Sequence, residues 1–127
     1  MLGPTNESSP MDADTILNSI DAAAYAKDLD GNYTYANAMV QRVFGADLAG
    51  IIGKDDSHFF DLEKSNALRE NDAEVIALGT SVAREERDII KQSGEERVYF
   101  TIKSPLRDAT GTIVGMCGFS IDITDRG

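Results

Sequence analysis

The chain has 127 residues, 42% of them hydrophobic and 27% charged, which is enough for one folded domain with its own core. Its 12 basic and 22 acidic residues give a formal net charge of −10, which argues against direct binding to nucleic acid or to an anionic membrane surface. One cysteine excludes an internal disulfide bond, and because no long apolar run or signal peptide is present we expect a cytoplasmic domain, with room for a membrane anchor elsewhere in a longer protein.

The first segment is rich in Pro, Ser, Gly and Asn, which predicts a flexible tail over residues 1–11. Acidic residues at Asp12 and Asp14 then suit the start of a helix. Ile16, Leu17 and Ile20 follow at helical spacing. We therefore predict an N-terminal helix over 12–21 that leads into the main domain, 22–126.

The main domain begins with two short strands, 22–27 and 32–36, around an Asp-Gly step that is typical of a hairpin turn. Asn37 is a helix N-cap candidate, and Gly45 is a natural helix end. A long helix is predicted over about 62–78, followed by strands at 81–92, 95–108 and 112–124. This order predicts an α+β fold in which helices pack on one face of a five-stranded antiparallel sheet.

Five fragments in this order resemble the PAS domain family. They are residues 26–37 (AKDLDGNYTYAN), Ile52-Gly53-Lys54 before Phe59-Phe60, residues 104–108, Val114-Gly115 after Gly111, and Asp122-Ile123-Thr124 near the end. The resemblance covers about residues 16–126. It implies a PAS fold with a small pocket, and a sensory role in a bacterial-type signal-transduction protein such as a histidine kinase or a cyclic-dinucleotide enzyme (a diguanylate cyclase).

In the family, the closing Asp and Thr fasten the last strand to the helix that leads into the effector domain. The resemblance therefore assigns signal output to Asp122, Thr124 and Asp125. Physically, Asp122 can pair with a basic residue, and Thr124 can cap a departing helix. The alternative is an ordinary strand end with turn residues.

The lining of the pocket stays open at this point. The resemblance implies that Val114, Met116, Gly118 and Ser120 of the last strand face inward. Either the polar set Tyr99, Thr101 and Lys103 or the apolar set Val98, Phe100 and Ile102 faces inward beside them. A polar interior would suit a polar or anionic ligand, with further candidates Tyr35, His58 and Arg87. Because burying Lys103 alone is costly, a polar interior also implies a ligand or an internal carboxylate.

The outer face of the last strand would then show Ile113, Cys117, Phe119 and Ile121. Such an apolar face needs a cover. The helix that carries Ile16, Leu17 and Ile20 is one candidate, from the same chain or from a second copy. We expect a homodimer.

Other chemistry receives little support. His58 precedes the long helix that carries the ligand in haem-binding relatives, and Cys117 lacks the motif of flavin-binding relatives, so no cofactor is expected beyond an unidentified small molecule. The 28–32 segment lacks the Gly and Glu spacing of a calcium loop, so no metal is expected. The acidic pairs Glu85-Glu86 and Glu95-Glu96 are expected on a solvated face, without catalytic residues.

The prediction is a non-enzymatic PAS sensor that binds a signal molecule or partner and acts on a C-terminal effector. Two alternatives remain: a ligand-free dimerisation module, and a small ligand-binding enzyme with a cone-shaped cavity.

Overall fold

The computed structural model describes residues 12–65 and 68–124, and the predicted tail at 1–11 lies outside them. Helix α1 (Ala13–Ser19) begins where the Asp12 side chain accepts a hydrogen bond from the Thr15 amide at 2.8 Å, as the acidic start predicts. Within the described residues, no helix is long and apolar enough to cross a membrane.

The predicted sheet is confirmed. All neighbouring strands are antiparallel, in the order β2-β1-β5-β4-β3. The strands are β1 (Ala23–Asp28), β2 (Tyr33–Ala36), β3 (Val82–Ile89), β4 (Glu96–Arg107) and β5 (Ile113–Asp122). The first and last strands in the sequence, β1 and β5, are therefore neighbours, and β5 lies in the centre of the sheet.

Between β2 and β3 run α2 (Ala38–Phe44), α3 (Leu48–Ile51), the short 3-10 helix η2 (Asp56–His58) and α4 (Leu68–Leu78). The prediction that the long helix begins near residue 62 is wrong. The Asp61 amide donates to the Ile89 carbonyl at 2.9 Å, and the Ile89 amide donates to Ser65 Oγ at 3.0 Å. These bonds hold the segment as turns against the end of β3.

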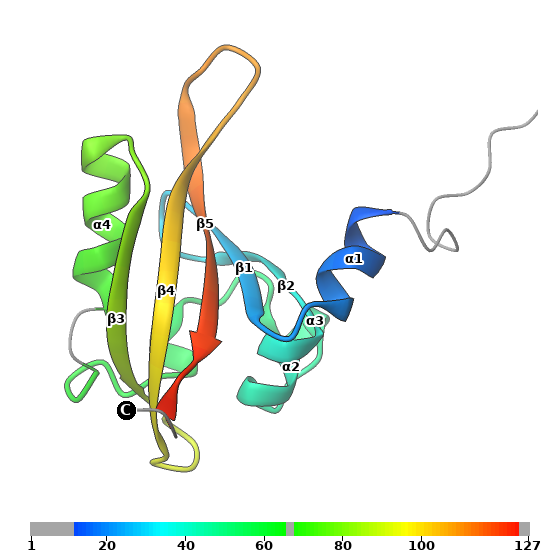
Figure 1. Ribbon diagram of the computed structural model, residues 1–127, viewed down its shortest axis with the longest axis vertical. Helices are drawn as coiled ribbons and strands as arrows, with labels where there is room; N and C mark the ends of the chain where they lie inside the picture. The colour runs from blue at the N-terminus through cyan, green and yellow to red at the C-terminus, as the bar shows by residue number, and fades with distance from the viewer. Residues whose placement is uncertain (1–11, 66–67, 125–127) are drawn as a thin grey trace, which may run out of the picture.

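The helices cover one face of the sheet (Figure 1): α4 packs on β3, β4 and β5, and α2 and α3 pack on β1 and β2. Helix α1 lies beyond β2, against α2. The Tyr35 hydroxyl donates to Asp14 at 3.1 Å there, and the Asn18 side chain accepts from the Ala38 amide at 2.8 Å. The expectation that this helix covers the outer face of β5 within one chain is therefore wrong.

Asn37 joins α1, β1 and α2. Its side chain is fully buried; Oδ1 accepts from the Ala24 and Val40 amides, and Nδ2 donates to the Leu17 and Ala22 carbonyls, at 2.9 to 3.2 Å. The cap predicted from the sequence thus also fastens the N-terminal helix to the domain.

Replacing Asn37 with Ala should lower the free energy of unfolding by about 3 kcal/mol, because it removes a helix cap and strands buried backbone groups. Urea denaturation measures this loss. The matched control, Asn18→Ala, removes one exposed bond and should cost less than about 1 kcal/mol. Equal losses in the two variants would contradict the joining role of Asn37.

Candidate functional site

The polar set of β4 faces the helices. Tyr99, Thr101 and Lys103 are buried, whereas Phe100 and Ile102 are exposed on the opposite face. Met116, Gly118 and Ser120 of β5 are buried with the polar set, as expected. Val114 is an exception and is exposed, because the register shifts between Leu106 and Arg107 and the end of the β4–β5 hairpin no longer follows the alternation.

Lys103 is almost completely buried and is held by internal carboxylates. Its Nζ lies 2.6 Å from Glu86 Oε2 and 2.7 Å from Asp72 Oδ1. Burial alone would lower the pKa of the Lys103 ammonium, but Tyr25, Asp72 and Glu86 raise it above the ordinary value. The expectation that Glu86 lies on a solvated face is wrong, since only its neighbour Glu85 is exposed.

A second buried lysine repeats this arrangement on β1. Lys27 Nζ lies 2.6 Å from both Asp56 Oδ2 of η2 and Asp72 Oδ2 of α4. The Tyr33 hydroxyl donates to Asp56 Oδ1 at 2.5 Å, and the Tyr33 ring centroid is 5.0 Å from the ammonium. Asp72 therefore bridges the two lysines, and both of them together lower its pKa against the effect of burial.

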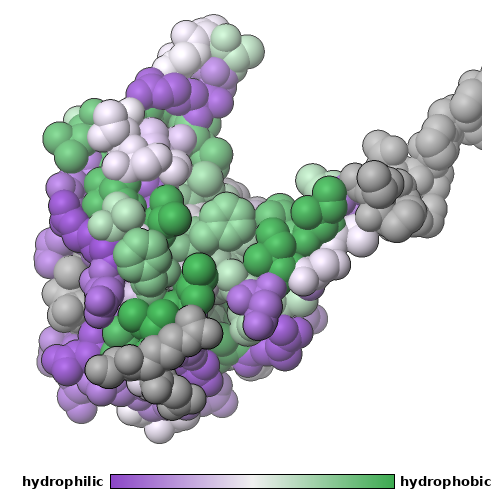
Figure 2. All heavy atoms as spheres, viewed as in Figure 1, coloured by the Kyte–Doolittle hydropathy of each residue, from purple (hydrophilic) through white to green (hydrophobic). Residues whose placement is uncertain are grey.

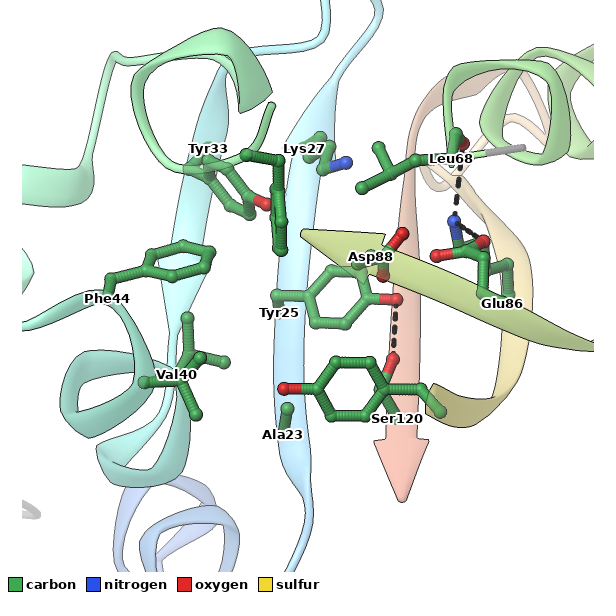
Figure 3. Close-up of a pocket in the computed structure, with 14 residues that line it drawn as sticks. Ala23, Tyr25, Lys27, Tyr33, Val40, Phe44, Leu68, Glu86, Asp88 and Ser120 are labelled. Atoms are coloured by element: carbon green, nitrogen blue, oxygen red, sulfur yellow. Dashed lines mark hydrogen bonds and ion pairs between the residues drawn. The ribbon is translucent and has the colours of Figure 1, made fainter. Parts of the chain in front are cut away.

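Beside this network lies a cavity of about 40 Å³ between the sheet and the helices (Figure 3). The Tyr25 ring reaches into it from β1, and its hydroxyl is 3.0 Å from Ser120 Oγ of β5. Gly118 makes this position possible, because a Cβ there would lie 2.7 Å from the Tyr25 ring. The lining residues are Ala23, Tyr25, Lys27, Tyr33, Val40, Val43, Phe44, Phe60, Leu68, Glu86, Asp88, Tyr99, Lys103 and Ser120.

Asp88 is the unusual group of this cavity. It is 3% exposed, and its Oδ1 has no hydrogen-bond partner in the described structure. Burial, the charge of the neighbouring Glu86 carboxylate and a hydrogen bond with that carboxylate raise the pKa of the Asp88 carboxyl to about 8. The group is therefore largely protonated at neutral pH.

Two larger hollows adjoin the cavity. One of about 410 Å³ shares Lys27 with it and is lined by Met116 and Arg69. The other, of about 160 Å³, shares Tyr99 and Ser120 and extends to Asp122. The second hollow thus links the cavity to the end of β5.

The sequence candidates are placed as follows. Tyr99, Lys103 and Ser120 line the cavity, Met116 lines the larger hollow, and Thr101 is buried with its hydroxyl on the Arg84 carbonyl at 3.2 Å. Three residues were assigned to the pocket wrongly. Tyr35 points to α1, His58 is exposed on η2, and Arg87 is exposed beside Glu96 at 3.3 Å.

Sequence reasoning missed Tyr25, Lys27, Glu86 and Asp88. Tyr25 and Lys27 are two residues apart on β1, and Glu86 and Asp88 are two residues apart on β3, so that both members of a pair lie on the same face. The alternation therefore identifies the second member of each pair once the first is known to face inward. Among the described residues, no group of three or more His, Cys, Asp or Glu side chains is arranged to hold a metal ion.

The end of β5 is fastened to β4. Asp122 accepts from Arg97 Nη1 at 2.8 Å and from the Thr124 amide at 2.9 Å, while Thr124 Oγ1 accepts from the Val98 amide at 3.0 Å. Partial burial raises the pKa of the Asp122 carboxyl, but the hydrogen bonds from Thr124 and Arg97 lower it further, so that it stays below its ordinary value. Asp125, the third predicted output residue, lies outside the described residues.

The outer face of the sheet is apolar. Phe100, Ile102, Val114, Phe119 and Ile121 are each between 38% and 46% exposed, and Cys117 is half-buried among them. Figure 2 shows apolar side chains gathered over β4 and β5 and again on α1. On α1, Ile16 is exposed and Leu17 is half-buried, and Ile20, directly after the helix, is exposed.

Comparisons with known proteins agree with this fold. The sequence model of the family described as PAS fold matches residues 17–127. A diguanylate cyclase of Vibrio cholerae is 34% identical over 111 residues, which are 87% of this chain and 35% of that protein. The methanogenesis regulatory histidine kinase FilI of Methanothrix harundinacea is 31% identical over 111 residues, 87% of this chain and 12% of that protein. The chain therefore spans a minor part of either relative.

A solved structure of VqmA from Vibrio cholera, in a complex with a ligand and DNA, is similar with a TM-score of 0.72 and 24% identity. The likeness covers 87% of this chain and 50% of that one. At this level of identity the comparison shows the shared fold.

The buried Asp88 carboxyl predicts a pH dependence of stability. Because its folded-state pKa of about 8 exceeds that of an unfolded Asp, the protonated group stabilises the fold at low pH, and this contribution is lost as the pH rises toward 8. The free energy of unfolding of Asp88→Asn, relative to that of the wild type, should therefore rise by up to about 1.4 kcal/mol per pH unit between pH 5 and 8. Denaturant unfolding across this range measures the difference.

Asp108→Asn is the control, because Asp108 is exposed and its pKa is lowered by bonds from Thr110 and Thr112. Its difference from the wild type should be flat over the same range. A flat difference for Asp88→Asn as well would show that Asp88 ionises normally.

Proposed function

The chain belongs to the PAS-fold family, and from this premise we propose that it is the sensory domain of a larger signalling protein. A small molecule binds in the core cavity, and β5 carries the change to an effector domain that follows. The domain itself is regulatory rather than catalytic. The observation that carries the proposal is that Ser120 lines the cavity while Asp122, two residues further along β5, fastens the end of the strand.

The relay is short. A ligand that moves the Tyr25 hydroxyl also moves Ser120, its partner at 3.0 Å. Ser120 and Tyr99 separate the cavity from the hollow that reaches Asp122. A shift of β5 by a fraction of an ångström would therefore alter the Asp122–Arg97 and Thr124–Val98 contacts, from which the chain leaves the domain.

The effector is proposed from the names of the relatives: a diguanylate cyclase or a histidine kinase domain. Such effectors use cytoplasmic nucleotides, which favours a cytoplasmic location for this domain. DNA is not proposed as a partner of this segment, in contrast to VqmA, because the net charge of −10 repels a phosphate backbone.

The outer face of β4 and β5 is proposed to bind a second copy of the chain. Across β4 and β5, Phe100 pairs with Ile121 and Ile102 with Phe119, and Ile16 of α1 and the following Ile20 are also exposed. A homodimer would bury both apolar groups and would place two C-terminal ends in one assembly, as a paired effector requires.

A second candidate function is a dimerisation module without a physiological ligand. The small volume of the cavity, about 40 Å³, favours it, since drug-sized ligands occupy several hundred. Native mass spectrometry of the purified protein separates the two functions. A mass lost on denaturation supports sensing, and a bare dimer that stays unchanged with every tested small molecule supports assembly alone.

Asp122→Ala should uncouple the domain while changing its stability by no more than about 1 kcal/mol, because Asp122 is exposed. In the isolated domain, the amides of Val98 and Thr124 should exchange with solvent faster, and core amides should be unaffected. In the full-length protein, the signal-dependent change in effector activity should fall severalfold.

The matched control is Asp108→Ala, which removes a similar turn at the other end of the hairpin. It should leave the output unchanged. A full response in Asp122→Ala, or equal losses in both variants, would refute the relay through β5.

The dimer proposal predicts that Phe119→Lys weakens self-association by about 2 kcal/mol or more, as expected for a central aromatic residue. Sedimentation equilibrium measures the change. Leu29→Lys, at an exposed apolar position on the β1–β2 turn, should dimerise like the wild type. A monomeric wild type, or a fully dimeric Phe119→Lys, would exclude this interface.

A further inference from the structure

The interior alternates positive and negative groups. Lys27 lies between two carboxylates, Asp56 and Asp72, and Lys103 lies between Asp72 and Glu86. Each ammonium is thus within 2.7 Å of two carboxylates. Because each ammonium is already paired with two carboxylates, the positive charge of both lysines is compensated within the protein, which argues against the anionic option raised by the sequence.

At Glu86 the alternation ends, because the next group is another acid. Asp88 lies next to Glu86 on the same face of β3, and Figure 3 shows its carboxyl between the Tyr25 ring and Glu86. Glu86 Oε2 already accepts from Lys103 and from Asn71 Nδ2 at 2.8 Å. Asp88 Oδ1 is buried at the cavity and has no hydrogen-bond partner among residues 12–65 and 68–124. The acidic end of the network therefore presents a buried oxygen atom, Asp88 Oδ1, at the cavity.

The charges of this network do not balance. Among the described residues, two lysines face four carboxyl groups there, of Asp56, Asp72, Glu86 and Asp88. With Asp88 protonated the network carries one excess negative charge, and with Asp88 ionised it carries two. Since buried charge is costly unless it is paired, the interior favours an added cation and disfavours an added anion.

The rest of the cavity wall also suits a small cation. Tyr25 and Tyr99 present rings and hydroxyl groups, and Phe44 presents a further ring. Aromatic faces attract ammonium groups, and Lys27 already lies 5.0 Å from the Tyr33 ring centroid and 5.7 Å from that of Tyr25. The volume of about 40 Å³ accommodates only a few non-hydrogen atoms, since one water needs roughly 10–15 Å³ on this measure.

We propose that the cavity binds a small primary ammonium compound, with Asp88 as its carboxylate partner and the Tyr25 and Tyr99 rings around it. The inference rests on the proposed sensory function and specifies the chemical class of the signal. No bond is formed or broken except the O–H bond of Asp88. The ammonium enters charged, Asp88 releases its proton to solvent, and the network gains a third cation.

This proton release sets a pH signature. The groups that face Asp88 are Glu86 on β3, Lys103 and Tyr99 on β4, and Tyr25 on β1, with Asp56 of η2 further away. The pKa of the Asp88 carboxyl, about 8, lies near the physiological range. Binding of a cation should therefore tighten about tenfold from pH 7 to pH 8.5, because one proton is displaced.

The test uses methylammonium chloride as the probe and the whole chain as the protein. Chemical-shift titration by NMR gives the dissociation constant at pH 7 and pH 8.5, with sodium chloride at matched ionic strength as the blank. Sodium acetate and acetamide, of similar size, test anionic and neutral ligands. We expect saturable methylammonium binding, about tenfold tighter at the higher pH, and no saturable binding of the other two.

Two variants localise the site. Asp88→Asn keeps the shape and neutral state of the protonated acid, and should weaken binding at least tenfold and abolish its pH dependence. Ala23→Val fills the cavity without changing a charged group, and it should also weaken binding. It tests the site independently if Asp88→Asn folds poorly. Asp108→Asn, on the exposed hairpin turn, should bind like the wild type.

The proposal is overturned if methylammonium behaves like sodium chloride, if Asp88→Asn binds as tightly as the wild type, or if affinity is the same at both pH values. If acetate or acetamide binds in the cavity instead, the cationic assignment fails while the sensory function stands. If neither these probes nor Asp122→Ala alters the output of the full-length protein, the proposed function fails with it.

Discussion

Burial of two lysine ammonium groups among four carboxyl groups is the constraint on which this structure depends. The groups come from β1, η2, α4, β3 and β4, and Asp72 of α4 touches both lysines at 2.6 to 2.7 Å. Removing one partner of such a network leaves an unpaired buried charge, which costs about 3–5 kcal/mol. The network therefore fixes where α4 lies on the sheet. It also fixes the register, since a one-residue slip of β4 would turn Lys103 to the outer face.

The same constraint shapes the cavity. The charged network borders the cavity on one side, and the aromatic cluster of Tyr33, Phe44 and Phe59 lies on the other, so both polar and apolar side chains line this space. Tyr25 and Ser120 connect this space to β5, which lies in the centre of the sheet. A change of charge in the interior is thus adjacent to the strand that leaves the domain. In the proposed function, the sensing cavity and the output contacts of Asp122 are therefore only a few residues apart.

Much of the fold could be predicted from the sequence because it depends on local signals. The turn at Asp30-Gly31, the Asn37 cap and the Gly45 helix end all lie where expected, since glycine with positive φ and short polar caps act locally. The start of α4 could not be predicted, because bonds between residues 61–65 and Ile89 are distant in sequence. The packing of α1 on α2 rather than on β5 likewise depends on Asn37, whose outward bonds no local pattern shows.

The site was predicted only in part for a similar reason. The alternation in β4 left two possible linings of the pocket, the polar set with Lys103 and the apolar set with Phe100. Deciding between them required a partner for Lys103, and that partner lies on another strand. The partner is Glu86 on β3. Because Glu85 is also acidic, the two residues resemble an exposed charged pair in the sequence, although only Glu85 is exposed. Tyr35, His58 and Arg87 have side chains that suit a polar ligand, but residue type alone does not give their orientation, and all three lie outside the cavity. Asp88 is recognisable only once the charges of the whole interior are counted.

The most direct test of this account is the ionisation of Asp88 itself. The side-chain carboxyl carbons of all Asp residues can be followed by ¹³C NMR from pH 4 to pH 10, with Asp88→Asn identifying the resonance. The account predicts one carboxyl with a midpoint near pH 8, which disappears in the variant. If every Asp carboxyl titrates below pH 5, Asp88 is ionised at neutral pH, and the protonated acid at the cavity does not exist.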